Sequence, residues 1–323
     1  MNEPLILGIG TDQGIQEEEI SRLLTRHGAD YEVATTPTPH PFTQEETGFY
    51  TSYRTDTGKV FAQGLKKGWT PIQNIECMRI LAAASKRSKI NLRHFFMFGG
   101  GRQIVAQIDL GTTDIGNGDK IGNYMSMING HDGGNSYSLW DTPFRFWCKN
   151  QINGSLKDAT ARKAIVSIKH SISSTEKLEV LMNSIQLSNN EFAKTVELYK
   201  QLMNIHVSDA LAYDIIDGFF PPKAEDAGPR SKTIRKHKVE DILFRYHSAD
   251  QGRTARQTAW NLYNAVQGHL QHYRTLTEAR QKSVLIGHDS KTAARAMAFI
   301  LSITASQHIA DALTIDQKAG IKL

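Results

Sequence analysis

The sequence predicts an α+β protein, in which an antiparallel, hairpin-rich sheet with a buttressing helix precedes a mainly helical C-terminal half. Up to about residue 170, short runs of alternating apolar and polar residues are separated by Gly-rich turns, which is typical of hairpins. From Ser173 onward the apolar period changes to about 3.6. Because local hairpins pair antiparallel strands, a doubly wound parallel sheet is not expected.

The first half is expected to hold one amphipathic helix, one extended segment, two hairpins, a ribbon of two strands and a last strand. Three prolines within six residues keep the extended segment out of a helix. Gly-containing turns at 56–58, 99–101 and 131–134 join the paired strands. In chain order the ranges are 17–27, 35–42, 49–53 with 60–63, 94–98 with 102–108, 124–130 with 136–140, and 165–170.

A buttressing helix is predicted between the first two hairpins. Thr70 is placed to cap it, Pro71 suits the first helical position, and Gln73 completes a capping box. Its apolar residues recur at helical spacing and should face the sheet. They are Ile72, Ile75, Met78 and Leu81.

Capping boxes predict the helices of the second half. The pairs are Ser173 with Glu176, Ser188 with Glu191, and Thr254 with Gln257, and a further apolar helix is expected at 291–313. The helix that follows Thr254 is expected to bury Trp260, Tyr263, Val266, Leu270 and Tyr273.

A flexible basic loop is predicted at 221–238, which contains three prolines, no apolar period and a basic end. The expected domains are 1–172, with the hairpins and a basic, aromatic ribbon, and 173–323, which is mainly helical and includes this loop.

Composition permits an anionic partner. The 323 residues include 38 Lys and Arg against 33 Asp and Glu, for a formal net charge of +5. Cys77 and Cys148 are too few for a zinc site or a disulfide framework, and are expected to be small buried apolar residues. No basic region precedes the first apolar residues, and no apolar run reaches about eighteen residues. The cytoplasm, without membrane insertion, is therefore the expected location.

Motifs for catalysis are weak. No GxxxxGK[ST] sequence is present, and the Gly-rich run at 99–102 lacks its lysine and following helix. His131 and Asp132 resemble part of a metal-dependent phosphohydrolase site, but such sites need further ligands, and Asp-Gly is typical of turns. No catalytic residue, metal ligand or cofactor is assigned.

Several motifs indicate a family. Gly130-His131-Asp132-Gly133, followed by TPFRFWCKN at 142–150, resembles the signature of the phage and plasmid family named domain of unknown function 932, in which an SHDG turn precedes TPxRxxCxNxL. The resemblance extends to LKKGWTPIQN at 65–74, SIKHS at 167–171 and TAWNLYNAV at 258–266. Trp69 and Gly130 stand where members commonly carry Tyr and Ser. The resemblance implies a mobile-element origin and DNA transactions, without an agreed reaction.

Basic and aromatic residues crowd the β half and predict a nucleic-acid interface. Stacking a base on an aromatic ring contributes about 1–3 kcal/mol, and Lys and Arg pair with phosphates in a salt-dependent way. The residues expected to hold phosphates are Lys66, Lys67, Arg102, Arg145, Lys149 and Lys169, and those expected to stack on bases are Trp69, Tyr137 and Trp147.

These observations predict a DNA-binding protein that holds single strands and anneals complementary strands without ATP. Its expected plan is similar to that of phage strand-annealing proteins, which assemble as rings or filaments, so a homo-oligomer is expected. A host or phage replication protein is a further candidate partner. Two alternatives stay open: a host-interaction or anti-defence protein with solvated basic residues, and a metal-dependent nuclease or phosphohydrolase that uses His131 and Asp132.

Overall fold

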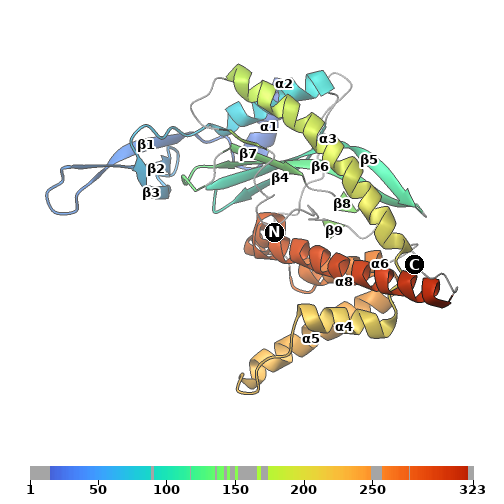
Figure 1. Ribbon diagram of the computed structural model, residues 1–323. Helices are drawn as coiled ribbons and strands as arrows, with labels where there is room; N and C mark the ends of the chain where they lie inside the picture. The colour runs from blue at the N-terminus through green and yellow to red at the C-terminus, as the bar shows by residue number, and fades with distance from the viewer. Residues whose placement is uncertain are drawn as a thin grey trace. The chain divides into compact units, whose positions relative to one another are not determined.

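A computed structural model describes residues 15–88, 91–116, 118–134, 137–141, 144–145, 150–151, 166–168, 174–248, 257–275 and 277–318. The chain forms two compact units (Figure 1). The first comprises Met1–Gly111, Asn123–Thr142 and Ala161–Glu191, and the second comprises Thr112–Gly122, Pro143–Thr160 and Phe192–Leu323. The units are therefore not the consecutive halves expected from the sequence, because the tip of one hairpin belongs with the C-terminal helices.

An antiparallel sheet, with the order β10-β7-β6-β5-β4, is the main layer of the first unit. The turns expected at 99–101 and 131–134 join β4 to β5 and β6 to β7, and both pairs are antiparallel, as expected for hairpins. Two short strands, β8 and β9, extend the sheet from β6. The bounds are β4 Asn91–Phe98, β5 Gln103–Gly116, β6 Asp119–Gly130, β7 Tyr137–Asp141, β8 Phe144–Arg145, β9 Asn150–Gln151 and β10 Val166–Ile168.

A second sheet has three antiparallel strands, β1 Val33–Pro39, β2 Glu46–Arg54 and β3 Val60–Lys66. The extended proline-rich segment is its edge strand β1, and the pairing with β2 shifts between Pro37 and Pro39. Proline lacks the N–H that a central strand must donate, so it is tolerated at an edge and at irregularities of the ladder.

Two helices support the sheets, α1 Glu17–Arg26 and α2 Asn74–Ser88. The buttressing helix is confirmed, since residues of both helices share one buried core with the strands. However, α2 begins four residues after Thr70. The Gln73 side chain instead pairs with the backbone of β1, accepting from Val33 N at 3.0 Å and donating to Val33 O at 2.9 Å. These bonds hold the chain before α2 in a non-helical conformation, although Ile72 is buried as expected.

One helix, α3 Ser174–Asn204, replaces the two that the capping boxes at Ser173 and Ser188 predict. Buried residues continue at helical spacing past Ser188, from Leu181 and Ile185 in the first unit to Val196 and Tyr199 in the second. Because both stretches bury one continuous apolar stripe, the helix does not restart at Ser188.

In the described part of the second unit, α3 is followed by α4, α5, α6, α7 and α8, and α6 is the most deeply buried of these helices along its length. Thr258 caps α6 by accepting from Asn261 N at 3.1 Å, so this helix begins later than the box at Thr254 predicts. Trp260, Tyr263, Val266 and Leu270 are buried as expected, whereas Tyr273 follows the end of the helix and is 40% exposed. The bounds are α4 Asp209–Phe219, α5 Pro229–His247, α6 Ala259–His272, α7 Glu278–Ile286 and α8 His288–Lys318.

The flexible basic loop expected at 221–238 ends at Gly228, and the rest of that range is helical. Pro229 occupies the first turn of α5, where its missing N–H costs nothing. Arg235 then pairs with Asp217 and donates to Phe220 O at 2.9 Å, which ties α5 to the end of α4. The basic residues of this range therefore lie on an ordered helix.

Two histidines, the buried His269 and the half-buried His94, predict that acid weakens the fold. Burial lowers the pKa of His94 and of His269 from the usual 6.5. The hydrogen bond of His94 with Gln107 and that of His269 with Asp241 raise these pKa values, but by less than burial lowers them. The unfolded chain then takes up protons first, so stability is present above about pH 6.5 and falls as the pH drops below it. Urea unfolding at pH 7.5 and 5.5 should show this loss, and His94→Gln with His269→Gln should reduce it. A loss of the same size in that double variant would contradict the assignment.

Candidate nucleic-acid interface

The nine residues predicted to contact nucleic acid are described to different extents. Side chains are described for Lys66, Lys67, Trp69, Arg102 and Tyr137. Only the backbone of Arg145 is described, in β8 opposite Ile121. Trp147, Lys149 and Lys169 lie outside the described residues, as does Cys148.

Tyr137 is wrongly predicted as a stacking residue. Its side chain is 0% exposed and belongs to the core that joins α2 to the sheet. Burial raises the pKa of its hydroxyl well above 10.0, which fits a neutral phenol in an apolar surrounding. A base cannot reach this ring without disrupting the core.

Strand β3 and two turns of the main sheet lie against one another in the first unit. The backbone N of His131 donates to Arg102 O at 2.9 Å, which links the turn after β6 to the turn before β5. Ser52 Oγ donates to His131 O at 2.7 Å. A Cβ at Gly133 would overlap Leu65 Cδ2, so the end of β3 touches the 131–134 turn. These contacts bring Arg102 into the neighbourhood of Lys66, 36 residues earlier in the chain.

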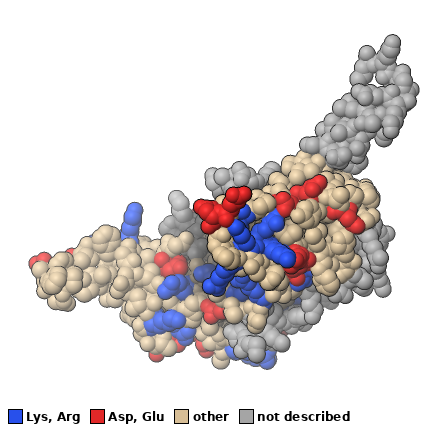
Figure 2. Space-filling model, turned by 90° about the horizontal axis from the view of Figure 1, so that it is seen from below, with Lys and Arg blue, Asp and Glu red and all other residues tan. Residues whose placement is uncertain are grey.

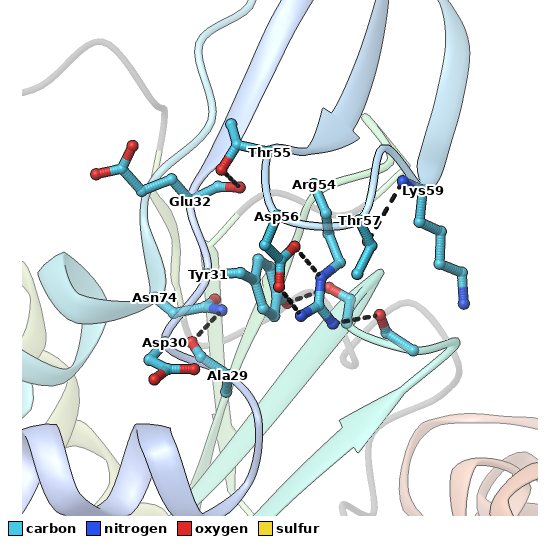
Figure 3. A network of polar contacts seen from close by, with 12 residues as sticks. Ala29, Asp30, Tyr31, Glu32, Arg54, Thr55, Asp56, Thr57, Lys59 and Asn74 are labelled. Atoms are coloured by element: carbon cyan, nitrogen blue, oxygen red, sulfur yellow. Dashed lines mark hydrogen bonds and ion pairs between the residues drawn. The ribbon is translucent and has the colours of Figure 1, made fainter.

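The other end of β3 is fixed by Arg54 (Figure 3). Its guanidinium makes two hydrogen bonds with Asp56, at 2.9 and 2.6 Å, and donates to Gly100 O at 3.2 Å. It also lies 3.8 Å from the ring centre of Tyr31, whose hydroxyl donates to Gly101 O at 2.6 Å. The pairing with Arg54 lowers the pKa of Asp56. Arg54 is thus occupied in holding the β2–β3 turn onto the β4–β5 turn.

Four other cations of this region differ from Arg54, because all are exposed and none makes an ion pair within the part of the chain that the structure describes. They are Lys59, Lys66, Lys67 and Arg102. Lys59 lies beside the Arg54–Asp56 pair in Figure 3, and a Cβ at Gly100 would overlap its Nζ. Lys59 is not among the residues predicted from the sequence, although its place beside the Asp-Thr-Gly turn marks it as a residue of an exposed hairpin loop.

An exposed ring stands beside this group of cations. Phe49 is 50% exposed and lies directly opposite Lys66 in the β2–β3 ladder. Side chains of directly opposed residues share one face of a sheet. Trp69 is half-buried, and its backbone N donates to Lys66 O at 3.1 Å. Two rings and two cations therefore lie close together in sequence or in the ladder, at Phe49, Lys66, Lys67 and Trp69. Of these, Phe49 was expected only as a strand residue.

His131 is a buried residue in a polar network. Its side chain is 0% exposed, and its Nε2 lies 2.9 Å from Asn74 Oδ1. Asn129 Nδ2 donates to Ile72 O at 2.9 Å and approaches the same Asn74 oxygen at 3.4 Å. The imidazole also stacks on Phe61, with ring centres 5.8 Å apart. Among the described residues, no group of three or more His, Cys, Asp or Glu is placed to hold a metal ion.

The model of the family described as "Domain of unknown function (DUF932)" matches residues 64–298. The chain belongs to the DUF932 family. A search of curated proteins and a search of solved structures give no significant match. Among the described residues, no helix is both long and apolar enough to cross a lipid bilayer.

Two DUF932 segments of this chain meet in the His131 network. The PIQN sequence supplies Ile72, Gln73 and Asn74, and the GHDG turn supplies His131, which bonds to Asn74. A third segment, TAWNLYNAV, forms the buried start of α6. In the described residues these three segments therefore help to hold the fold together, and the segment at 65–74 also carries the exposed Lys66 and Lys67.

Proposed function

We propose that this DUF932 protein binds single-stranded nucleic acid in the first unit and anneals complementary strands without ATP. One contrast carries the proposal. Arg79 and Arg87, exposed on α2, pair with Glu17 and Glu179 at 2.6 and 2.8 Å. Among the described residues, the exposed cations along β3 and in the β4–β5 turn make no such pair. Exposed cations without ion pairs, on a strand and the turns next to it, favour a polyanion as their partner.

The spacing of these cations suits an extended strand. Lys59 precedes β3 and Lys66 is its last residue, and seven residues of β-strand span about 23 Å. A backbone held along this length would meet several phosphates, and Phe49 beside Lys66 would offer a ring to one base. Such contacts are independent of base sequence, so the bases stay available for pairing with a second strand. A homo-oligomer would extend the same surface along a longer strand.

The decisive test removes three charges from this surface. Lys66→Ala/Lys67→Ala/Arg102→Ala should weaken binding of an oligo(dT) strand and reduce its salt dependence, because each lost phosphate contact lowers the log–log slope by about 0.7. Three lost contacts thus lower the slope by about 2. Fluorescence anisotropy over a range of salt concentrations measures both quantities.

A matched variant removes three exposed charges elsewhere in the same unit. Arg22→Ala/Arg79→Ala/Arg87→Ala changes the net charge equally but leaves β3 and the β4–β5 turn intact. Its slope should stay close to that of the unmodified protein. Equal losses in the two triple variants would reduce the effect to net charge and refute the assigned surface. If the unmodified protein binds no strand at low salt, the host-interaction alternative replaces the proposal.

Annealing is tested separately with two complementary strands, one of them carrying a fluorescent label. The unmodified protein should accelerate duplex formation without ATP, and the Lys66/Lys67/Arg102 variant should not. Phe49→Ala should weaken strand binding while leaving the salt slope unchanged, because stacking releases no counterions. Strand binding without acceleration would leave the binding function and refute annealing.

A further inference from the structure

A cavity of about 650 Å³ lies in the second unit, between the end of α4, the loop before α5 and the first half of α5. This volume is within the range of sites for small organic ligands. One part of its wall is apolar and the other is basic. The apolar residues are Phe219, Phe220, Pro221 and Ile234, and the basic residues are Lys223, Arg230, Arg235 and Lys238.

Positive charge dominates this part of the surface. Figure 2 shows Lys and Arg atoms next to one another on the face that it draws, with acidic atoms beside and among them. The residues that line the cavity include four Lys or Arg and no Asp or Glu. The first turn of α5 contains no acidic residue, so the positive end of its helix dipole is not offset there. Both features favour an anion.

The four cations of the cavity differ in whether they already have a partner within the protein. Arg235 is paired with Asp217 and bonded to Phe220 O. Lys238 Nζ lies 4.6 Å from the ring centre of Phe220. Lys223 and Arg230 are exposed, and neither makes an ion pair among the described residues. These two side chains are therefore available to a ligand.

The positive charge of Lys238 is repelled by the charges of neighbouring basic residues. Its pKa is lowered by burial first and then by the nearby charges of Lys223 and Arg274, which outweigh the opposite effect of Asp289. A bound anion would offset this repulsion and return the ammonium group to its ordinary basicity. The apolar wall adds a second requirement, since a bare inorganic anion would leave the rings facing water.

We infer that this cavity binds one nucleotide unit, with its phosphate held by Lys223, Arg230 and Lys238 and its base against Phe219, Pro221 and Ile234. A nucleotide joins a phosphate to a flat ring whose faces can stack on apolar and aromatic groups. A free mononucleotide and the phosphorylated end of a strand present this same unit. The inference does not depend on the cations along β3, which belong to the first unit.

The test is calorimetric titration with thymidine 5′-monophosphate, inorganic phosphate and oligo(dT) with or without a 5′-phosphate. Lys223→Ala/Arg230→Ala should weaken binding of the mononucleotide about tenfold or more, because two charge-assisted contacts are lost. Lys291→Ala/Arg295→Ala removes two exposed charges of α8 and should leave binding unchanged. Ile234→Ser should weaken the mononucleotide but not inorganic phosphate.

The outcomes distinguish a strand end from a free nucleotide as the ligand, and they distinguish this cavity from the proposed surface along β3. In the Lys66/Lys67/Arg102 variant, preference for the 5′-phosphorylated strand over both the unphosphorylated strand and the mononucleotide identifies a strand end, and preference for the mononucleotide identifies a free nucleotide. The Lys66/Lys67/Arg102 variant should bind the mononucleotide normally even where it has lost strand binding. No binding of either phosphorylated ligand, or equal losses in the Lys223/Arg230 and Lys291/Arg295 variants, would overturn the inference.

Discussion

Trp260→Ala should lower the free energy of unfolding by about 3–5 kcal/mol, the usual cost of truncating a large buried aromatic residue. Trp260 is 0% exposed at the start of α6, and its ring lies 4.6 Å from that of Tyr199 on α3. Its indole N–H donates to Asp119 Oδ2 at 3.0 Å, across 141 residues of sequence. One side chain therefore joins α6, α3 and the tip of the β5–β6 hairpin within the second unit. Urea unfolding followed by circular dichroism measures the loss.

A double-mutant cycle separates the hydrogen bond from the packing. Trp260→Phe keeps most of the ring and removes the indole donor, and Asp119→Ala removes the acceptor. Each should cost about 1–3 kcal/mol, since Asp119 is only 3% exposed and a buried polar group loses its bond. The double variant should cost less than the sum of the two. Additive costs would show that the bond contributes nothing and that Trp260 acts through packing alone.

Local patterns of the sequence were sufficient where neighbouring residues decide the structure. The turns at Gly58 and Gly99–Gly101 are encoded within a few residues, and the hairpins follow from them. Trp260 and Tyr263 are buried as their helical spacing predicts. The predicted start of α2 at Thr70 was wrong because Gln73 forms hydrogen bonds with Val33, 40 residues away, and no local signal encodes that contact.

The candidate site was less predictable than the fold. Alternation places Tyr137 on one face of its strand but does not say that α2 covers this face, so a core residue was taken for a stacking one. Phe49 has the same aromatic character and is exposed. The proximity of Arg102 to β3 depends on contacts through His131 and Leu65, which are long-range. The basic residues of α5 were expected in a loop, where they would not line a fixed cavity.

Gly101→Ala should cost about 3 kcal/mol or more, combining backbone strain of about 1–2 kcal/mol with a clash that disturbs a network. Gly101 has a φ of +105°, and a Cβ there would lie 2.5 Å from Tyr31 Oη and 2.7 Å from Cζ. The ring of Tyr31 would have to move, which breaks its bond to Gly101 O and removes the surface on which Arg54 lies. The β2–β3 turn would then lose its attachment to the β4–β5 turn.

Gly58→Ala is the matched control for that substitution. Gly58 also has a positive φ, +68°, but nothing lies within 4 Å of the position of its Cβ. It should therefore cost only the left-handed backbone strain, about 1–2 kcal/mol. Urea unfolding of both variants measures the difference, which belongs to Tyr31 and its bonds. Equal costs would mean that the Tyr31–Arg54 network does not fasten the two turns, and that β3 is positioned by Leu65 and Ser52 at the 131–134 turn instead.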